Sequence, residues 1–496
     1  MKSVEIKSCN SRFHKNIGKY AVSLTDSCFH CGLCVEICPY CVFDRKDGFN
    51  HVSIPNSAGC LGPDCKEGPY YCTAKCPVDA IKIELDPQWK TLGDFRWTPD
   101  LIITTWEQAE TGEIPKGNLE YKIGASGGGF DVFDFTVDGF AAISSEEIDN
   151  IITSDKISTS ICLNRRGEGP SIEIPVPWYG AGMSFGSISL PSILARAHSA
   201  KVWKTFTSTG EGGYPDELIP YRNHVITQIA TGLFGVSEET IKRTPIIEFK
   251  YAQGAKPGLG GHLLADKNTP GVAKMRETVP WNSLFSPFPF HSVYSIEDHK
   301  KHIDWVKTIN PDALISVKVS TPSDVDMVAV GSYYAGANII HLDGGYGGTG
   351  AAPEIAKKNI AMPIEYAITK VHKFLVEEGV REEIVLLASG GIRTAFDIAK
   401  SIALGADGAI IGTSELVALG CVRCGNCESG RGCPRGIATT DPELEKQIDP
   451  SWGAQRIINL YASWQKQLKL LLYKLGLKDI KELRGRTDFL KHIDEK

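Results

Sequence analysis

The chain has 496 residues, of which 42% are hydrophobic and 23% are charged, with a formal net charge of −6. This composition excludes a disordered or low-complexity chain and leaves room for about three domains. Because charges of both signs are spread along the chain and no apolar run reaches about 18 residues, we expect a cytoplasmic protein that binds neither nucleic acid nor a membrane.

The N-terminal region, residues 1–85, is dominated by cysteine. Ten of the fifteen cysteines precede residue 77, and in a long chain without a secretion signal such clusters indicate metal ligation rather than disulfides. The first run has the C-x2-C-x2-C-x3-C-P spacing of bacterial ferredoxins, in which the fourth cysteine ligates a second cluster. The second run has wider spacing but also ends before a proline. The predicted ligand sets of two 4Fe-4S clusters are Cys28, Cys31, Cys34 and Cys76 for one and Cys60, Cys65, Cys72 and Cys38 for the other. A pair of zinc sites is the alternative, and the wider spacing leaves Cys60 and Cys65 less secure as ligands.

The next region, residues 86–168, is polar and irregular, and we expect it to be a linker that covers the rest of the protein. From 169 to 445, short β-rich runs alternate with helical stretches, which is typical of βα units around a parallel sheet. The pattern predicts an α/β fold, a (β/α)8 TIM barrel, with its chemistry on the loops after the strands. Residues 446–496 are expected to form a helical extension packed on the barrel. The clearest predicted strands are Ile246–Tyr251, Leu314–Val319, Asn338–Asp343, Ile384–Ser389 and Gly408–Gly412.

Two glycine-rich loops follow the last two predicted strands. One contains Gly390, Gly391 and Arg393, and the other contains Gly412 and Thr413. In barrels a phosphate commonly lies between the last two such loops, where backbone N–H groups and a short helix meet it. The two loops together therefore predict a flavin phosphate site.

A further glycine-rich run, His341 to Gly350, follows an earlier strand. Without Cβ atoms its backbone can approach a ring or a phosphate closely, and a plain tight turn is the alternative. Lys318 lies inside a predicted buried strand, where an ammonium needs a partner. The N1–C2=O edge of a reduced flavin would serve, and a structural carboxylate is the alternative.

Cations follow another predicted strand. The glycine-rich loop from Gln253 to Gly261 carries Lys256, and Lys274 and Arg276 come soon after it. Lysine and arginine can clamp the two carboxylates of a diacid. Solvated surface charge is the alternative.

Four cysteines after the last predicted strand, within 421–433, form a third set. Four thiolates so close together indicate a cluster or a zinc ion. The neighbouring flavin-type loops favour an electron-carrying iron–sulfur cluster. The predicted ligands are Cys421, Cys424, Cys427 and Cys433.

Several of these motifs, in the same order, resemble those of the glutamate synthase large subunit over roughly residues 170–490. The similar runs are Gly180–Ser189, Ser208–Gly213, Gln253–Gly258, Tyr294–Asp298, Gly344–Pro353, Ile437–Pro442 and Leu475–Leu490. The resemblance implies an FMN-dependent reductive amination. Ammonia condenses with 2-oxoglutarate to give 2-iminoglutarate, and reduced FMN delivers hydride to the imine carbon.

The resemblance also implies residue roles. Gln253, Lys256 and Arg276 would bind 2-oxoglutarate, and Lys256 and Glu297 would be catalytic, with Glu297 the acid near the imine. A structural role of Glu297 in its loop is the alternative. The residues that would hold FMN are Met183, Ser184, Lys318, Gly345, Gly390, Gly391, Gly412 and Thr413.

The chain also departs from the family pattern. It starts at Met1-Lys2 where the usual large subunit has a glutamine amidotransferase domain, so we expect ammonia from solution or from a separate amidotransferase subunit. It has no Rossmann-type nucleotide-binding unit, so a separate electron donor is expected, either a ferredoxin or an NAD(P)H-oxidising flavoprotein. Near its FMN the family has a 3Fe-4S cluster with three cysteines. Here Cys424 is additional and Cys433 comes one residue late, which favours a 4Fe-4S cluster.

Two other functions stay open at this point. A related FMN enzyme could join another amine, such as methylamine, to the same acid, as an N-methylglutamate synthase does. Alternatively, the chain could be an iron–sulfur flavoprotein subunit that only transfers electrons. Lys256 and Arg276 distinguish the last case, because an electron relay needs no pair of cations for a diacid.

Overall fold

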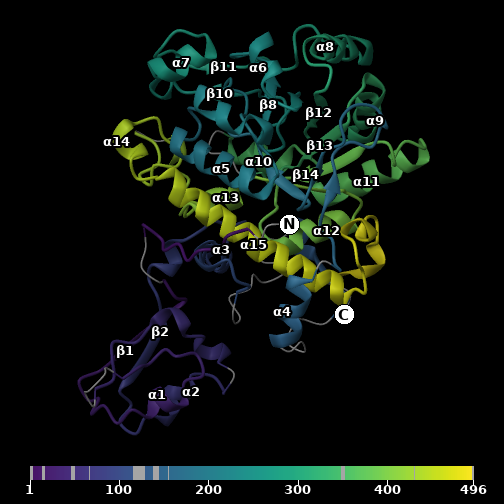
Figure 1. Ribbon diagram of the computed structural model, residues 1–496. Coiled ribbons are helices and arrows are strands. Elements are labelled where there is room, and N and C mark those ends of the chain that lie inside the picture. The colour runs from purple at the N-terminus through teal and green to yellow at the C-terminus, as the bar shows by residue number, and fades with distance from the viewer. Residues whose placement is uncertain are drawn as a thin grey trace.

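Eight parallel strands form the centre of the computed structural model, which describes residues 4–13, 17–45, 51–65, 67–115, 129–137, 145–154, 156–347, 352–428 and 431–493 (Figure 1). Their order in the sheet is β6, β15, β14, β13, β12, β9, β8 and β7. The bounds are β6 (Trp178–Gly180), β7 (Thr207–Ser208), β8 (Val225–Ala230), β9 (Ile246–Lys250), β12 (Leu314–Val319), β13 (Ile339–Asp343), β14 (Val385–Ser389) and β15 (Gly408–Ile411).

The two ends of this strand order also meet. The N–H of Gly180 donates to the carbonyl of Phe206 at 2.8 Å, and Gly182 forms a parallel bridge with Ser208. The sheet is therefore closed, and the predicted (β/α)8 TIM barrel is confirmed.

The five predicted strands correspond to β9, β12, β13, β14 and β15, each within one residue at either end. Their residues are buried almost throughout, because the barrel interior covers one face of each strand and the outer helices cover the other. The first three barrel strands were not predicted. β6 and β7 are very short, and the apolar run of β8 is interrupted by Thr227, which hydrogen-bonds to Thr240, and by Gln228, which hydrogen-bonds to Glu248.

Helices surround the barrel, and several begin at a serine or threonine cap. The side chains of Ser189, Ser237, Ser295 and Thr394 each accept a backbone hydrogen bond from the first turn of a helix. The outer helices are α5 (Leu190–Trp203), α6 (Glu238–Lys242), α8 (Ile296–Ile309), α9 (Val325–Ala335), α11 (Ile364–Glu377), α12 (Ala395–Ala403) and α13 (Thr413–Ala418).

The long loops at the C-terminal ends of the strands carry further elements. The loop after β9 contains the short hairpin β10 (His262–Leu263) and β11 (Leu284–Phe285) and the helix α7 (Pro270–Arg276). The loop after β13 leads to α10 (Glu354–Asn359), and the loop after α13 leads to α14 (Pro442–Glu445).

The C-terminal extension is mostly one helix, α15 (Pro450–Lys474), which packs against α5 and buries Trp464 and Leu468 (Figure 1). The expectation that the extension is helical is wrong at its end, where β16 (Leu490–His492) pairs with β3 (Phe133–Phe135). Among the described residues, no helix is both long and apolar enough to cross a membrane.

The segment expected to be irregular contains a regular helix, α3 (Pro99–Thr111). Leu101, Ile102 and Trp106 are buried, and the Trp106 indole N–H donates to the carbonyl of Val417 at 3.0 Å. The polar composition of the segment as a whole conceals this apolar face, which covers the barrel helix α13. The other described elements of this region are α4 (Ser145–Thr153), β4 (Ile161–Cys162) and β5 (Glu173–Ile174).

The cysteine-rich region forms a lobe of its own, drawn in purple in Figure 1. β1 (Tyr20–Leu24) pairs antiparallel with β2 (Ile81–Leu85), and α1 (Leu33–Ile37) and α2 (Tyr71–Lys75) lie between them in the sequence. A small separate core packs inside the lobe. The four-part division of the chain stays a prediction.

Candidate functional site

A cavity of about 260 Å³ opens at the C-terminal ends of the barrel strands. Barrel enzymes have their active sites at this end. Its polar lining comes from the ends of β7 and β9 and the loop after β9: Glu211, Lys250, Gln253 and Lys256. Gln253 and Lys256 were predicted from the sequence to bind the substrate, whereas Glu211 and Lys250 were not singled out.

Glu211 is the only acidic side chain among the described residues that line this cavity. The Lys250 ammonium lies 2.9 Å from Glu211 Oε2 and 3.3 Å from Gln253 Oε1. Burial alone would raise the pKa of Glu211, but Lys250, Lys256 and Arg276 outweigh it and hold this pKa below the ordinary value. Glu211 is therefore an ionised carboxylate surrounded by cations.

Lys256 has a buried side chain whose ammonium makes no hydrogen bond or ion pair within the described part of the chain. Burial lowers the pKa of Lys256, and the nearby Glu211 partly restores it. A buried cation that lines a cavity without a close partner can bind an anionic ligand there.

Arg276 links this cavity to the loop after β6. Its Nη2 donates to Ser184 Oγ at 3.2 Å and to the carbonyl of Phe185 at 3.0 Å, and Nε has no acceptor among the described residues. A Cβ at Gly212 would lie 2.8 Å from Arg276 Nη2, so the guanidinium lies directly against the backbone beside Glu211. Two of the predicted sites, Ser184 and Arg276, are thus in contact.

Lys318 has a carboxylate partner, which was the alternative to a flavin edge. Its ammonium lies 3.1 Å from Asp343 Oδ2, and both side chains are buried. Burial would lower the pKa of Lys318, but Asp343 and Glu248 raise it above the ordinary value. Burial would likewise raise the pKa of Asp343, but Lys318 and His341 bring it to about 2. Both groups are therefore charged.

Asp343 also connects the neighbouring loops. Its Oδ2 accepts from the N–H of Gly254 at 3.0 Å, and its Oδ1 accepts from Ser389 Oγ at 2.5 Å. Ser389 in turn lies 2.7 Å from His341 Nε2, and His341 Nδ1 lies 3.0 Å from Glu248 Oε2. This buried network joins the loop that carries Lys256 to the two loops that carry the predicted flavin glycines.

The glycines predicted to hold FMN form a tightly packed group of loops. Gly390 and Gly391 have φ of +88° and +93°, and a Cβ at Gly390 would lie 2.5 Å from the carbonyl oxygen of Gly344. Gly345 is buried beside them. The backbone N–H groups of Gly391, Ile392 and Thr413 donate to no acceptor within the described residues. Loops with exposed donors and without Cβ atoms fit a phosphate or a planar ring.

Some residues that the sequence analysis singled out have no free charge at the site, lie away from the cavity or lie outside the described residues. Arg393 pairs with Asp131 and Asp397, so its charge is already balanced. Glu297 lies on the exposed first turn of α8 and is not among the residues that line the cavity. A hydrogen bond from Ser295 lowers the pKa of Glu297, which makes it a weaker acid donor. Residues 348–350 of the glycine-rich run lie outside the described residues.

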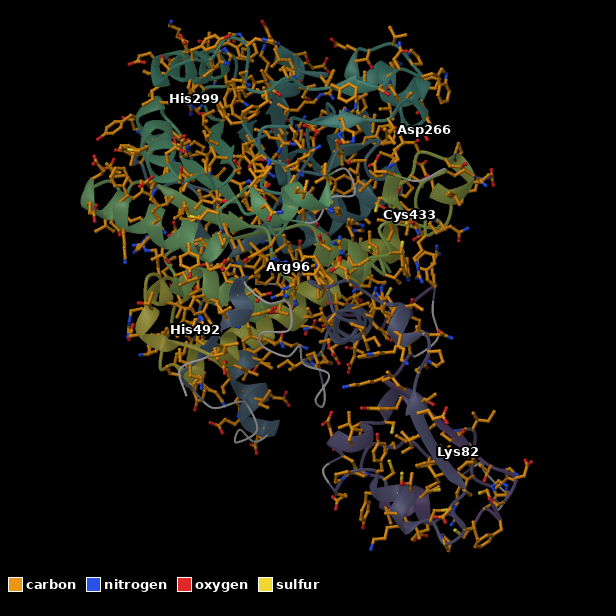
Figure 2. All side chains as sticks on the ribbon, turned by 180° about the vertical axis from the view of Figure 1, so that it is seen from behind. Lys82, Arg96, Asp266, His299, Cys433 and His492 are labelled. Atoms are coloured by element: carbon orange, nitrogen blue, oxygen red, sulfur yellow. The ribbon has the colours of Figure 1, made fainter. Side chains whose placement is uncertain are left out.

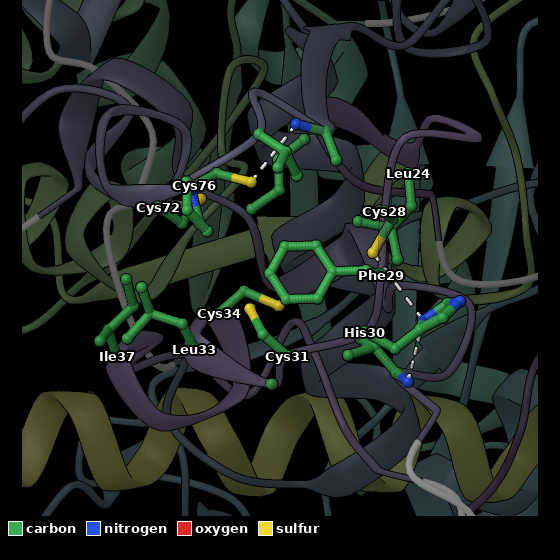
Figure 3. A pocket seen from close by; sticks show the side chains of 16 residues that line it. Leu24, Cys28, Phe29, His30, Cys31, Leu33, Cys34, Ile37, Cys72 and Cys76 are labelled. Atoms are coloured by element: carbon green, nitrogen blue, oxygen red, sulfur yellow. Dashed lines mark hydrogen bonds between the residues drawn. The ribbon is translucent and has the colours of Figure 1, made fainter.

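The two N-terminal cysteine sets each line a cavity of about 380 Å³. In Figure 3 the side chains of Cys28, Cys31, Cys34 and Cys76 surround Phe29 at the first cavity. The second is lined by Cys38, Cys60, Cys65 and Cys72. Cys76 lines the first cavity and Cys38 the second, while Cys72 lines both, and the two ligand sets stay a prediction.

The third cysteine set lies beside the barrel, where Figure 2 labels Cys433. Cys421 is packed against the apolar residues of α3 and α13, and its Sγ accepts from the N–H of Arg423 at 3.4 Å. The Lys267 ammonium donates to the carbonyl of Cys427 at 2.5 Å. Cations therefore surround this loop. No group of three or more His, Cys, Asp or Glu side chains converges on one metal ion anywhere in the described residues.

Comparison with known proteins gives consistent results. Residues 144–478 match the family model described as the conserved region in glutamate synthase. The archaeal-type NADPH glutamate synthase of Thermotoga maritima is 36% identical, covering 94% of this chain and 93% of that protein. The archaeal NADPH glutamate synthase of Methanocaldococcus jannaschii is 42% identical, covering 70% and 67%. A solved mandelate oxidase variant with an FMN adduct is 14% identical and has a TM-score of 0.43, covering 79% of this chain and 91% of that one.

Proposed function

Because this chain belongs to the glutamate synthase family, we propose that its barrel makes glutamate from 2-oxoglutarate and ammonia in the cavity beside Glu211. In this oxidoreductase reaction, ammonia replaces the keto oxygen of 2-oxoglutarate and water leaves. Two electrons and a proton then reach the imine carbon as hydride, and the nitrogen takes up the protons from water that make it the ammonium group. The product is glutamate.

The net positive charge at the cavity is the main observation that supports this proposal. Lys250 and Lys256 line the cavity with the single carboxylate of Glu211, and Arg276 lies against Gly212 next to them, so the group leaves two positive charges, which match the two negative charges of 2-oxoglutarate. Lys256 has no close partner of its own and is available to one substrate carboxylate, and Arg276 would bind the other through its unpaired Nε. Gln253 can then donate from its amide to a substrate oxygen.

We assign the carboxylate near the imine to Glu211 in place of Glu297, with an electrostatic role rather than that of an acid. An ionised carboxylate inside the cavity stabilises the protonated imine, whose positive charge develops where the amine adds. Glu297 is exposed and lies outside the cavity lining, so we assign it no chemical step.

FMN is the proposed cofactor, and the residues present fit it. Gly345, Gly390, Gly391, Gly412 and Thr413 form loops with free backbone N–H groups and no Cβ atoms in the way. Lys318 would lie at the ring, and Met183 and Ser184 follow β6 on the Arg276 side. When bound, FMN supplies the hydride, while the surrounding residues hold the substrate and exclude water.

Three iron–sulfur clusters would bring the electrons. The two lobe cavities have a suitable size, and cysteines line both: Cys28, Cys31, Cys34, Cys72 and Cys76 the first, and Cys38, Cys60, Cys65 and Cys72 the second. The loop of Cys421, Cys424, Cys427 and Cys433 would hold the third cluster, 4Fe-4S in preference to 3Fe-4S. Its cationic surroundings suit an anionic cluster.

The ammonia source and the electron donor would be separate proteins. The similar glutamate synthases of Thermotoga maritima and Methanocaldococcus jannaschii are named as NADPH enzymes. We propose that in this protein a separate flavoprotein or ferredoxin delivers the electrons, and that a separate amidotransferase subunit can supply ammonia.

The direct test is an anaerobic assay of the purified protein, reduced by dithionite or by ferredoxin. With 2-oxoglutarate and ammonium we expect glutamate, and with methylamine in place of ammonium little N-methylglutamate. A preference for methylamine would favour the related amine-joining enzyme. If flavin and clusters are intact and no amino acid forms with either amine, the proposal is wrong and an electron-transfer subunit is favoured.

A further inference from the structure

A short segment between the cysteine-rich lobe and the barrel, residues 93–97, contacts three of the loops described above. Its first contact is with the third cysteine loop, where the N–H of Gly93 donates to the carbonyl of Val422 at 3.0 Å. Asp94 forms an ion pair with Arg423 at 2.7 Å. The other oxygen of Asp94 accepts from the N–H groups of Arg96 and Trp97 at 2.9 and 2.8 Å, which closes the segment into a tight turn.

Arg96, labelled in Figure 2, contacts residues of the two glycine-rich loops. Its guanidinium carbon lies 3.4 Å from the centre of the Tyr346 ring, in the loop after β13. Its carbonyl accepts from Nη1 of Arg393 at 3.1 Å, in the loop after β14. One residue outside the barrel thus holds both loops.

Tyr346 has little room to move from this position. A Cβ at Gly391 would lie 3.2 Å from the Cβ of Tyr346, and a Cβ at Gly129 would lie 2.8 Å from its ring. The ring therefore lies between Gly129 and Arg96 and directly against the backbone of Gly391. If the ring moves, the two loops lose their relative position.

Several residues that hold Tyr346 and Arg393 come from outside the part of the chain that matches the glutamate synthase family model, residues 144–478. Asp131, which pairs with Arg393, lies in the same N-terminal region as Arg96 and Gly129. The N–H of Gly129 also donates to Glu365 of α11 at 3.2 Å. The N-terminal region therefore contacts the loops after β13 and β14 and also the helix α11.

We propose that Arg96 is a positioning residue for the FMN site: it stacks on Tyr346 and so fixes Gly345 and Gly391 where the cofactor binds. The inference rests on the proposed FMN site. Because Asp94 binds Arg423 in the same turn, the segment also fixes the third cysteine loop relative to the flavin loops.

The test compares Arg96→Ala and Arg96→Lys with the unchanged full-length protein. FMN is removed and titrated back while flavin fluorescence is recorded, and the melting temperature is measured in parallel. Arg96→Ala should weaken FMN binding about tenfold, which is the range of a desolvated cation–π contact. Arg96→Lys keeps the charge but not the planar stacking, and should fall between the two.

Two further comparisons test whether Arg96 affects FMN binding through Tyr346. Tyr346→Leu should weaken FMN binding to a similar extent, and the double variant should lose little more, because the two residues act together. Arg12→Ala removes another arginine–aromatic contact, that with Trp452 on α15, and should leave FMN binding unchanged.

The outcomes separate the inference from the proposed function. If the unchanged protein binds FMN and Arg96→Ala binds it within twofold as tightly, Arg96 is not a positioning residue. Additive losses in the double variant would also overturn the route through Tyr346. If the unchanged protein binds no FMN, the proposed function itself is wrong, and the inference falls with it.

Discussion

The Lys250 ammonium lies 2.9 Å from the Glu211 carboxylate at the mouth of the barrel. Lys250 ends β9, and Glu211 follows β7. They meet because the C-terminal ends of the parallel strands all lie at one edge of the barrel, although β8 separates β7 from β9 in the sheet. This pair keeps Glu211 ionised where substrate would bind.

Replacing Glu211 with Gln should lower kcat about a hundredfold, since removing one electrostatic stabiliser of a developing charge costs this much. FMN binding should not change. Glutamate formation under saturating ammonium measures the effect. The matched variant is Glu297→Gln, which should retain most of the activity, and the opposite ranking of the two variants would restore Glu297 as the catalytic acid.

Replacing Lys256 with Met should raise KM for 2-oxoglutarate roughly tenfold to a hundredfold, the range of a lost charge-assisted hydrogen bond. Steady-state kinetics with varied 2-oxoglutarate measure it. Lys274→Met is the control because Lys274 is exposed on α7, close in sequence to Arg276. Equal KM values in both variants would remove Lys256 from the substrate site.

Replacing Gly390 with Ala should abolish FMN binding and lower the melting temperature. The added Cβ would lie 2.5 Å from the Gly344 carbonyl, and φ is +88°. Gly379→Ala has the same kind of backbone strain at φ of +74° but meets no atom within 4 Å. It should cost only about 1 kcal/mol and keep FMN. Flavin content and thermal melts of the two variants distinguish clash from strain.

Replacing Cys38 with Ser should remove or convert one cluster of the lobe, the one that Cys60, Cys65 and Cys72 would share. EPR of the reduced protein and iron analysis report this loss. Cys41→Ser should leave both measurements unchanged, because Cys41 is exposed and lines neither cavity. Full cluster content in Cys38→Ser would contradict the exchange of ligands between the two runs.

His299 should make the protein sensitive to acid. Burial between aromatic rings lowers the pKa of His299 from 6.5 to about 4, with a small further effect of His302. The unfolded chain takes up this proton below pH 6.5 while the folded chain stays neutral, so stability is complete above 6.5 and falls toward pH 4. The loss is on the order of 2–3 kcal/mol. Urea unfolding of His299→Phe should show a flatter acid limb, with a difference from the unchanged protein that is constant above pH 7.

Local patterns were sufficient for some features of this site. The five strand predictions succeed because each strand is an apolar run that ends at glycine or polar residues. The cysteine sets were identified because ligand spacing and the following proline are written in consecutive residues. Lys256 was found in the same way, as a cation in a glycine-rich loop after a strand.

Other features required the fold. Glu297 belongs to a conspicuous motif, yet it is exposed on the first turn of α8, and the motif does not show which side of the helix faces solvent. α3 was missed because its apolar face is visible only against α13.

The sequence by itself determined the kind of chemistry, through cysteine spacing, glycine-rich loops and the order of family motifs, because these are properties of consecutive residues. Only the tertiary structure decided which charges meet. Closing the barrel brings Glu211 to Lys250 and Lys318 to Asp343, and folding the N-terminal region against the barrel brings Arg96 to Tyr346. Charge compensation and stacking act over a few ångströms between residues far apart in the chain, so no local pattern records them.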